Sequence, residues 1–331
     1  MKWFFLIIPL SVILFIGGLL LIKPIVIETN PAIKENPPQV KEKQSIKIIL
    51  AGDIMLDRGV EYMINKEGNG DFKFPFLKIA NDLKSADILF GNLEGPISDK
   101  GERVGSIYSF RAVPKAIEGL SFAGFDVISL ANNHAFDYGR GALEDTLKRL
   151  NADGVSYAGA GFNGEEAHSP IVKEIKGTKI GFLAYTNLGS PYWKAIGENS
   201  GIALVSENDF EKLRNDIQNA KDKVDILIIS LHSGEEYFKE PTKFQIDFSR
   251  TAIDAGADVV SGHHPHVVQR NEIYQNGYIF YSLGNFIFDQ SFSEETMRGQ
   301  IVEILIENGK IKEAIPREVK ISNFFQPEIK Q

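Results

Sequence analysis

Seven short apolar runs alternate along the chain with stretches that have an amphipathic helical pattern. The apolar runs cover residues 46–52, 87–92, 126–132, 179–186, 225–232, 258–263 and 278–285. The amphipathic stretches lie at about 75–85, 114–123, 140–152, 207–222 and 242–256. Short apolar runs predict buried strands, and their alternation with helices is typical of an α/β or layered α+β domain with a central, largely parallel sheet. Beyond residue 298, alternating residues around Asn308-Gly309 predict a terminal β-hairpin.

The first 45 residues have a different composition. No residue from Trp3 to Ile22 is charged, and about 20 apolar residues are enough for one helical bilayer crossing. A cleaved signal peptide is the alternative, but no cleavage site of A-x-A type follows. We therefore predict a signal anchor over 1–23, a proline-rich linker over 24–45, and a folded domain over 46–331 outside the cytoplasmic membrane.

Net charge and cysteine content exclude several partners and sites. The formal net charge is −8 at pH 7 and the sequence has no basic stripe, so nucleic acid is not an expected partner. The chain has no cysteine, which excludes disulfides, thiolate zinc sites and cysteine nucleophiles.

Polar side chains gather where the predicted strands end. They are Asp53, Asn92, Glu94, Asn132, Asn133, His134, Asp137, His232, Glu235, His263, His264, His266, Asn285 and Asp289. Ligands of such sheets bind in the crevice outside the carboxyl ends of the strands, so these segments predict one site. Taken singly, most of these residues have a structural explanation as turn or helix-capping residues, as do Asp57 and Asp99. His168 is expected to be structural. Three of the chain's six histidines within residues 263–266 are not explained in this way.

The donor types at this edge predict a metal centre. A mixed set of imidazole and carboxylate favours one or two divalent ions of Mn, Fe or Zn. Pro265 stiffens the turn between His264 and His266, which limits the entropy lost on binding. Residues 123–134 and 255–266 also share the order helix end, glycine, strand and terminal histidine, which suggests two similar units that supply imidazoles to one edge.

The motifs resemble, in order from Ile46 to Asp289, those of the capsule synthesis protein CapA family, which is associated with poly-γ-glutamate capsule production. They are GDIMLDR, GNLEGPIS, YSFRAVP, LANNHAFDYG, HSGEEY, GADVVSGHHPHVVQ and YSLGNFIFD. The domain of that family resembles the calcineurin-like metallophosphoesterases. The resemblance therefore implies an α+β fold of four layers, an αββα sandwich, preceded by one N-terminal transmembrane helix.

The same resemblance implies roles for single residues. Metal ligands would be Asp53, Glu94, Asn133, His232, His264 and His266. His134 would protonate the leaving group, oriented by Asp137. Substrate-binding residues would be Arg58, Arg111, Asn92, Glu235 and Asn285, although a surface ion pair is an alternative for either arginine. The sequence departs from the phosphoesterase pattern at Met55, where D-x-H has histidine, and at Glu94, which replaces the bridging aspartate of GDxxD.

Three functions follow from these expectations. The first is a membrane-anchored, metal-dependent hydrolase or transferase in poly-γ-glutamate synthesis, export or anchoring, with an anionic polymer or a phosphorylated or amide substrate. The second is a non-catalytic scaffold or polymer-binding component that works with other capsule synthesis proteins. The third is a secreted phosphoesterase or nucleotidase. His134 and Asp137 favour an enzyme, since a scaffold needs no general acid, and the acidic net charge opposes binding of a polyanion away from the metals and arginines.

Overall fold

The computed structural model describes residues 45–104 and 106–330. The predicted signal anchor over 1–23 and residues 24–44 of the predicted linker lie outside these residues. Ser45, which we had placed in the linker, is the first residue of strand β1. None of the helices in the described part of the chain combines the length and the apolar composition of a bilayer span.

The first sheet has eight strands, ordered β16-β15-β14-β1-β2-β3-β4, with β13 paired to β1. Its strands are β1 (Ser45–Ile54), β2 (Ile88–Leu93), β3 (Val127–Ser129), β4 (Ser156–Ala158), β13 (Asn285–Ile287), β14 (Arg298–Glu307), β15 (Lys310–Ile321) and β16 (Pro327–Ile329). Strands β1 to β4 are parallel. The predicted hairpin is confirmed as β14 and β15, and Asn308 and Gly309 both have the positive φ that a tight two-residue turn requires.

The second sheet has six strands in the order β11-β12-β10-β9-β7-β6, and β5 and β8 form a separate small pair. The bounds are β5 (Ala160–Gly161), β6 (Ile171–Ile175), β7 (Thr178–Thr186), β8 (Gly201–Ile202), β9 (Ile226–His232), β10 (Val259–His263), β11 (Asn271–Tyr274) and β12 (Gly277–Phe280). The strand pattern by itself suggested one central sheet, and this prediction was wrong. A strand buried between two sheets has the same continuous apolar sequence as one buried between two layers of helices.

The helices are α1 (Arg58–Glu67), α2 (Ala80–Leu83), α3 (Ile117–Ala123), α4 (Gly139–Ala152), α5 (Gly164–His168), α6 (Phe210–Lys221) and α7 (Lys243–Asp254). The structure confirms a helix in each predicted stretch, although α2 is only a short segment of the first one. Helices α1 and α5 were not predicted. Asp57 caps α1 by accepting a hydrogen bond from the backbone N–H of Arg58, which confirms a capping role for this aspartate.

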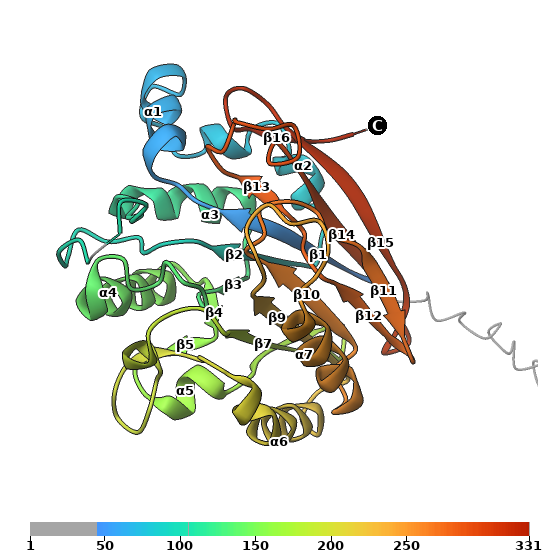
Figure 1. The fold of residues 1–331 in the computed structure, drawn as a ribbon. Helices are drawn as coiled ribbons and strands as arrows, with labels where there is room; N and C mark the ends of the chain where they lie inside the picture. The colour runs from blue at the N-terminus through green and yellow to red at the C-terminus, as the bar shows by residue number, and fades with distance from the viewer. Residues whose placement is uncertain (1–44, 105, 331) are drawn as a thin grey trace, which may run out of the picture. The chain divides into compact units, whose positions relative to one another are not determined.

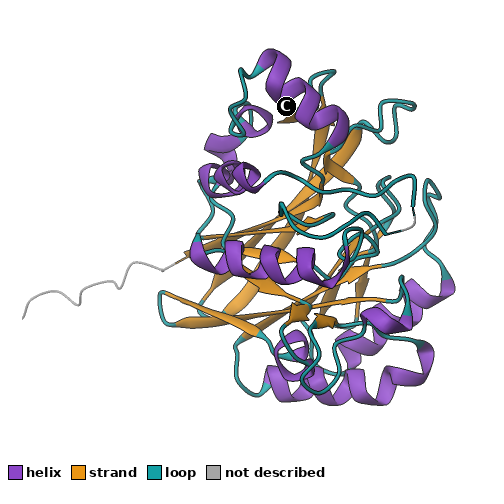
Figure 2. Cartoon of the chain, turned by 90° about the vertical axis from the view of Figure 1, so that its left-hand side faces the viewer, coloured by secondary structure: helices purple, strands orange, loops and turns teal. Residues whose placement is uncertain are grey.

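The described residues form four layers, with helices on the outer faces of two packed sheets (Figures 1 and 2). Ile48 and Leu50 of β1 pack against Phe182 of β7 and Ile228 of β9 in the core between the sheets. The intervening Ile49 faces the opposite core, which contains residues of α1, α3 and α4. The outer face of the second sheet has its own core with α6 and α7. The αββα layering implied by the resemblance is therefore present.

The carboxyl ends of the parallel strands of both sheets meet at one edge of the sandwich. Asp53 of β1 pairs in register with Asn92 of β2 and with Asn285 of β13. In the other sheet, His232 ends β9 beside His263 at the end of β10. The two similar segments of the sequence lie one in each sheet, and each turns into its strand through a glycine of positive φ, Gly124 or Gly256.

Candidate metal centre

Asp53 lies at the junction of the two sheets and is completely buried. Its carboxylate accepts hydrogen bonds from Asn92 Nδ2 (2.9 Å) and from the backbone N–H of His264 (3.1 Å), and it lies 3.1 Å from His263 Nδ1. Burial raises the pKa of Asp53, but the hydrogen bond and charge of His263 outweigh it, and the pKa lies below its ordinary value. The side chain is therefore ionised and firmly held.

Asp53, Glu94 and His232 form the inner group, in which one ligand atom of each residue lies within 4.8 Å of the others. Both oxygens of Glu94 are buried and have no hydrogen-bond partner among the described residues. Burial and the charge of Asp53 raise the pKa of Glu94 well above its ordinary value. A buried carboxyl without a partner is costly, and a cation offsets that cost, so the inner group fits a divalent ion.

Asn133 adds an oxygen donor to the inner group. Its Oδ1 lies 2.7 Å from His232 Nε2, which is 3.5 Å from Glu94 Oε1. Ligand atoms about 2.1 Å from one ion lie roughly 3 to 3.5 Å apart, which the separation between His232 and Glu94 matches. The 2.7 Å separation between His232 and Asn133 is a hydrogen bond, which a shared ion would replace. Burial lowers the pKa of His232 well below its ordinary value, which leaves the imidazole in the neutral form that a metal requires.

Glu236, His264 and His266 form the outer group, again with ligand atoms within 4.8 Å of one another. The imidazole centroids of His264 and His232 are 4.9 Å apart, so the two groups are neighbours. His264 Nδ1 is buried without a hydrogen-bond partner in the described part of the chain. Burial, together with His266, lowers the pKa of His264 to about 3.

The backbone is strained in residues 263–266, the histidine turn. His264 and His266 have φ values of 97° and 58°, in the region that favours glycine. Such backbone costs about 1–3 kcal/mol per residue and occurs mostly at functional sites. His263, in contrast, lies between Asp53 and Ser261 Oγ with its ring buried near Phe90, a structural position.

Asn92 and Asn285 position ligands, which corrects their expected role in substrate binding. Asn92 is completely buried, with its Nδ2 on Asp53 and 3.3 Å from His232 Nδ1. Asn285 is 1% exposed, and its Oδ1 accepts a hydrogen bond from His266 Nδ1 (2.9 Å). Neither side chain has surface for a substrate. A hydrogen on Nδ1 leaves Nε2 of His266 as the ligand nitrogen.

A pocket of about 580 Å³ opens beside the outer group and Asn133. Its lining residues are Arg58, Ser106, Tyr108, Phe110, Asn133, His134, Glu236, Tyr237, His266, Gln290 and Phe292. His134 Nδ1 donates to Asp137 Oδ2 (2.8 Å), which also accepts the backbone N–H of Phe110 (2.7 Å). The imidazole packs against the Phe110 ring with centroids 4.1 Å apart. The ring is thus fixed on one side, and Nε2 remains available to the pocket.

The two predicted arginines differ in position. Arg58 lines the pocket and forms a bidentate pair with Asp289 at 2.8 and 3.1 Å. Arg111 donates to the carbonyls of Lys100 and Gly101 and packs on a tyrosine ring outside the pocket lining. The expected substrate contact of Arg111 therefore has no support from these contacts and stays a prediction.

Glu236, not Glu235, reaches the ligands. Glu235 is exposed and belongs to neither group of ligands, and its expected role in substrate binding stays a prediction. The acidic pair in HSGEEY was visible in the sequence, but its spacing does not tell which carboxylate turns inward. Tyr108, Phe110, Tyr237, Gln290 and Phe292 were also missed, because nothing local distinguishes them from core or surface residues.

The variant Glu94→Gln provides a test of the buried carboxyl. The pKa of Glu94 in the folded protein exceeds its ordinary value of 4.5. Between these two pH values, the folded state retains a proton that the unfolded state has released. The free energy of unfolding therefore falls as the pH rises from 4.5 to the pKa of the folded protein. The slope is at most about 1.4 kcal/mol per pH unit. We expect the free energy of unfolding of Glu94→Gln, relative to the ion-free natural protein, to increase from pH 4.5 to pH 8. Urea unfolding in chelator measures this difference, and a difference that does not vary with pH would contradict the assignment.

Comparison with known proteins gives the chain its family. The model of the bacterial capsule synthesis protein PGA_cap matches residues 47–290. The chain is 31% identical to "Capsule biosynthesis protein CapA" of Bacillus anthracis, covering 86% of this chain and 70% of that protein. It is 30% identical to "PGA biosynthesis protein CapA" of Bacillus subtilis (strain 168), covering 89% and 80% respectively.

Among solved structures, a hypothetical protein from Thermus thermophilus matches with a TM-score of 0.52 at 15% identity, covering 83% of this chain and 99% of that one. That likeness shows a shared fold alone. The family match spans most of the described residues, from the beginning of β1 to Gln290 beside the pocket, and it includes both groups of ligands. The chain therefore belongs to the bacterial capsule synthesis protein PGA_cap family.

Proposed function

We propose that this chain is a metal-dependent hydrolase or transferase, of metallophosphoesterase type, that acts in the synthesis, export or anchoring of a poly-γ-glutamate capsule. The observation that supports metal dependence is the buried Glu94 carboxyl, which has no hydrogen-bond partner in the described residues and lies beside Asp53 and His232. The names of the Bacillus relatives, which refer to capsule and PGA biosynthesis, support the biological role.

The residues present fit one or two ions of Mn, Fe or Zn. Asp53, Glu94, His232 and Asn133 would hold the inner ion, and His264 and His266 the outer one. A divalent ion supplies Lewis-acid chemistry, since it polarises a phosphoryl or carbonyl oxygen and lowers the pKa of a water molecule. Asn133, Glu236 and His266 line the pocket, so a substrate oxygen there would lie close to these ligands.

His134 is proposed as the general acid. Asp137 accepts the Nδ1 hydrogen and thereby fixes the ring, so the protonated imidazole would donate from Nε2 to the leaving group. Asp137 stabilises the positive charge of that imidazolium and is itself held by the backbone N–H of Phe110. Arg58 offers the pocket a guanidinium that a substrate anion would share with Asp289.

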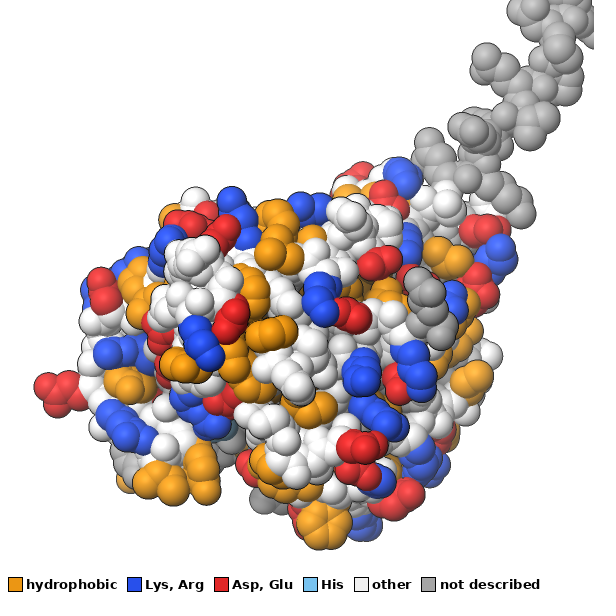
Figure 3. Space-filling view, turned by 90° about the horizontal axis from the view of Figure 1, so that it is seen from above, with side chains coloured by type: hydrophobic (Ala, Val, Ile, Leu, Met, Phe, Trp, Pro, Cys, Tyr) orange, Lys and Arg blue, Asp and Glu red, His pale blue; other side chains and the backbone are white. Residues whose placement is uncertain are grey.

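The location and partners form part of the same proposal. Residues 1–23 would anchor the protein in the cytoplasmic membrane as a single pass, with the folded domain outside and other capsule synthesis proteins as partners. Acidic and basic side chains are interspersed on the face of the protein seen in Figure 3. An anionic polymer would therefore be held at the metal centre and Arg58 rather than by that face.

The proposal is tested with the full-length protein supplied with Mn²⁺. Hydrolysis of γ-linked glutamate oligomers and of a generic phosphodiester is measured, and each assay is repeated with chelator. We expect turnover of the oligomers that chelator abolishes and Mn²⁺ restores. Turnover of the phosphodiester alone would point to a phosphoesterase instead, and bound metal without turnover of either substrate would point to a scaffold.

A further inference from the structure

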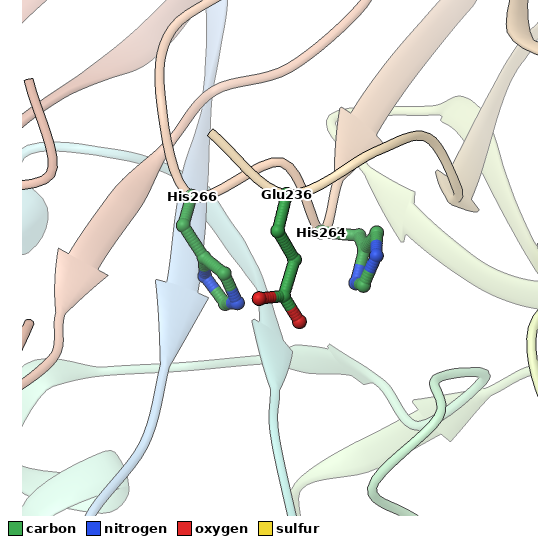
Figure 4. Close-up of side chains that lie close together, drawn as sticks. All are labelled: Glu236, His264 and His266. Atoms are coloured by element: carbon green, nitrogen blue, oxygen red, sulfur yellow. The ribbon is translucent and has the colours of Figure 1, made fainter. Parts of the chain in front are cut away.

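The outer group contains a carboxylate that none of the motif correspondences explains. The Glu236 carboxylate lies between the imidazoles of His264 and His266 (Figure 4). One oxygen of Glu236 and one nitrogen of each histidine lie within 4.8 Å of each other. Two imidazoles and one carboxylate are a common donor set for Zn, Mn and Fe.

Independent evidence for a ligand comes from His264. Only 7% of the surface of His264 is exposed, and its Nδ1 has no hydrogen-bond partner in the described residues. Buried imidazole nitrogens normally have a partner, since leaving one unpaired costs about 1–3 kcal/mol. A cation between His264, His266 and Glu236 would provide that partner.

The backbone fixes the loop that contains Glu236 onto the histidine turn. The N–H of Tyr237 donates to the carbonyl of Pro265 at 2.8 Å, between the two histidines. Gly234 turns the chain with a φ of 126°, and a Cβ there would meet the side chains of Gln245 and Pro265. The loop around Glu236 is therefore held on the histidine turn by a main-chain hydrogen bond after Glu236 and by close packing of Gly234 before it.

A chain of side-chain hydrogen bonds connects the same loop to His266. Asn285 Oδ1 accepts from His266 Nδ1, and Asn285 Nδ2 donates to Gln290 Oε1 at 3.0 Å. Gln290 Nε2 in turn donates to the hydroxyl of Tyr237 at 3.2 Å. The network thus connects His266 with Tyr237, the residue next to Glu236, and outer hydrogen bonds of this kind usually orient the ligands of an ion.

Met55 explains why a further ligand is needed. It stands where the D-x-H pattern has an imidazole, and its sulfur accepts the backbone N–H of Asp57 at 3.1 Å in a fully buried position. The first sheet therefore supplies no imidazole at this position to the outer group.

We propose that Glu236 is a metal ligand that completes a second divalent-cation site with His264 and His266, in place of the imidazole that position 55 lacks. The inference rests on the proposed metal-dependent function and adds the composition of the outer site. Glu236 is exposed, whereas all three residues of the inner group are buried. The outer ion is therefore the more weakly bound and the more readily exchanged of the two.

The test is a titration of the chelator-treated, full-length protein with Mn²⁺, in which EPR measures the free ion. The variants are Glu236→Gln and, as a matched control, Glu235→Gln. We expect two bound ions in the natural protein and in Glu235→Gln. In Glu236→Gln we expect one ion of unchanged affinity, with the second weakened by about 100-fold or more. Because Glu236 is exposed, its variant should melt at the same temperature as the natural protein in chelator.

The other outcomes separate the two proposals. Two ions of unchanged affinity in Glu236→Gln would overturn the role of Glu236. A single ion in the natural protein, kept by Glu236→Gln and lost by Asp53→Asn, would overturn the outer site and leave the proposed function standing. No bound ion in any form of the protein would overturn both.

Discussion

Asp53→Asn is expected to remove the inner ion and to lower the free energy of unfolding of the ion-free protein by about 2–4 kcal/mol. The Asp53 carboxylate is fully buried and accepts hydrogen bonds from Asn92 Nδ2 and from the backbone N–H of His264. The single side-chain oxygen of an asparagine accepts a hydrogen bond from one of these donors. The NH₂ group of the asparagine faces the other donor, which then lacks an acceptor. The lost negative charge also removes the ionised ligand of the inner group, so we expect metal affinity to fall by about 100-fold or more.

Urea unfolding in chelator measures the first effect, and elemental analysis after dialysis against Mn²⁺ measures the second. Asp57→Asn is the matched control, since Asp57 lies four residues along the chain, belongs to neither ligand group and caps α1, a role that asparagine also performs. If Asp53→Asn keeps its full metal content, the inner group is not a metal site.

His134→Ala is expected to reduce turnover by about 10²- to 10⁴-fold while the bound metal is unchanged. The imidazole is held by Asp137 and Phe110 and borders the pocket, but it belongs to neither ligand group. A general acid acts in the chemical step, so we expect kcat to fall and the KM to change little.

The chain offers a matched control in His168, whose Nδ1 lies 3.0 Å from Asp216 Oδ2 in a similar pair that does not line the pocket. His168→Ala should keep its turnover. Asp137→Asn should lie between His134→Ala and the natural protein, because the imidazole remains but loses its orienting carboxylate. An unchanged rate in His134→Ala would show that another group protonates the leaving group, and His134 would no longer be the proposed general acid.

Local patterns in the sequence determined much of the fold. The apolar runs gave β1, β2, β7, β9 and β10 close to their observed bounds, since a continuous apolar run of strand length has few other ways to be buried. The terminal hairpin followed from Asn308-Gly309, because these residues adopt the positive φ of a tight turn at little cost. Helix α1 was missed, because its amphipathic pattern lies directly beside the strand-end motif that contains Asp53.

The sequence also determined that side chains able to bind a metal gather at one edge of the sheets. They directly follow the predicted strands, and the carboxyl ends of parallel strands lie at the same edge. The tertiary structure alone decided which of them meet. Asn92 and Asn285 lie behind the ligands, Arg111 is bound to nearby carbonyls, and Glu236 rather than Glu235 reaches the histidines. Contacts at this edge join segments that are far apart in the sequence, such as His264 and Asp53, which are 211 residues apart. Which side chain turns inward depends on the packing of two sheets and on the path of a loop, and neither is encoded in the spacing of a single motif.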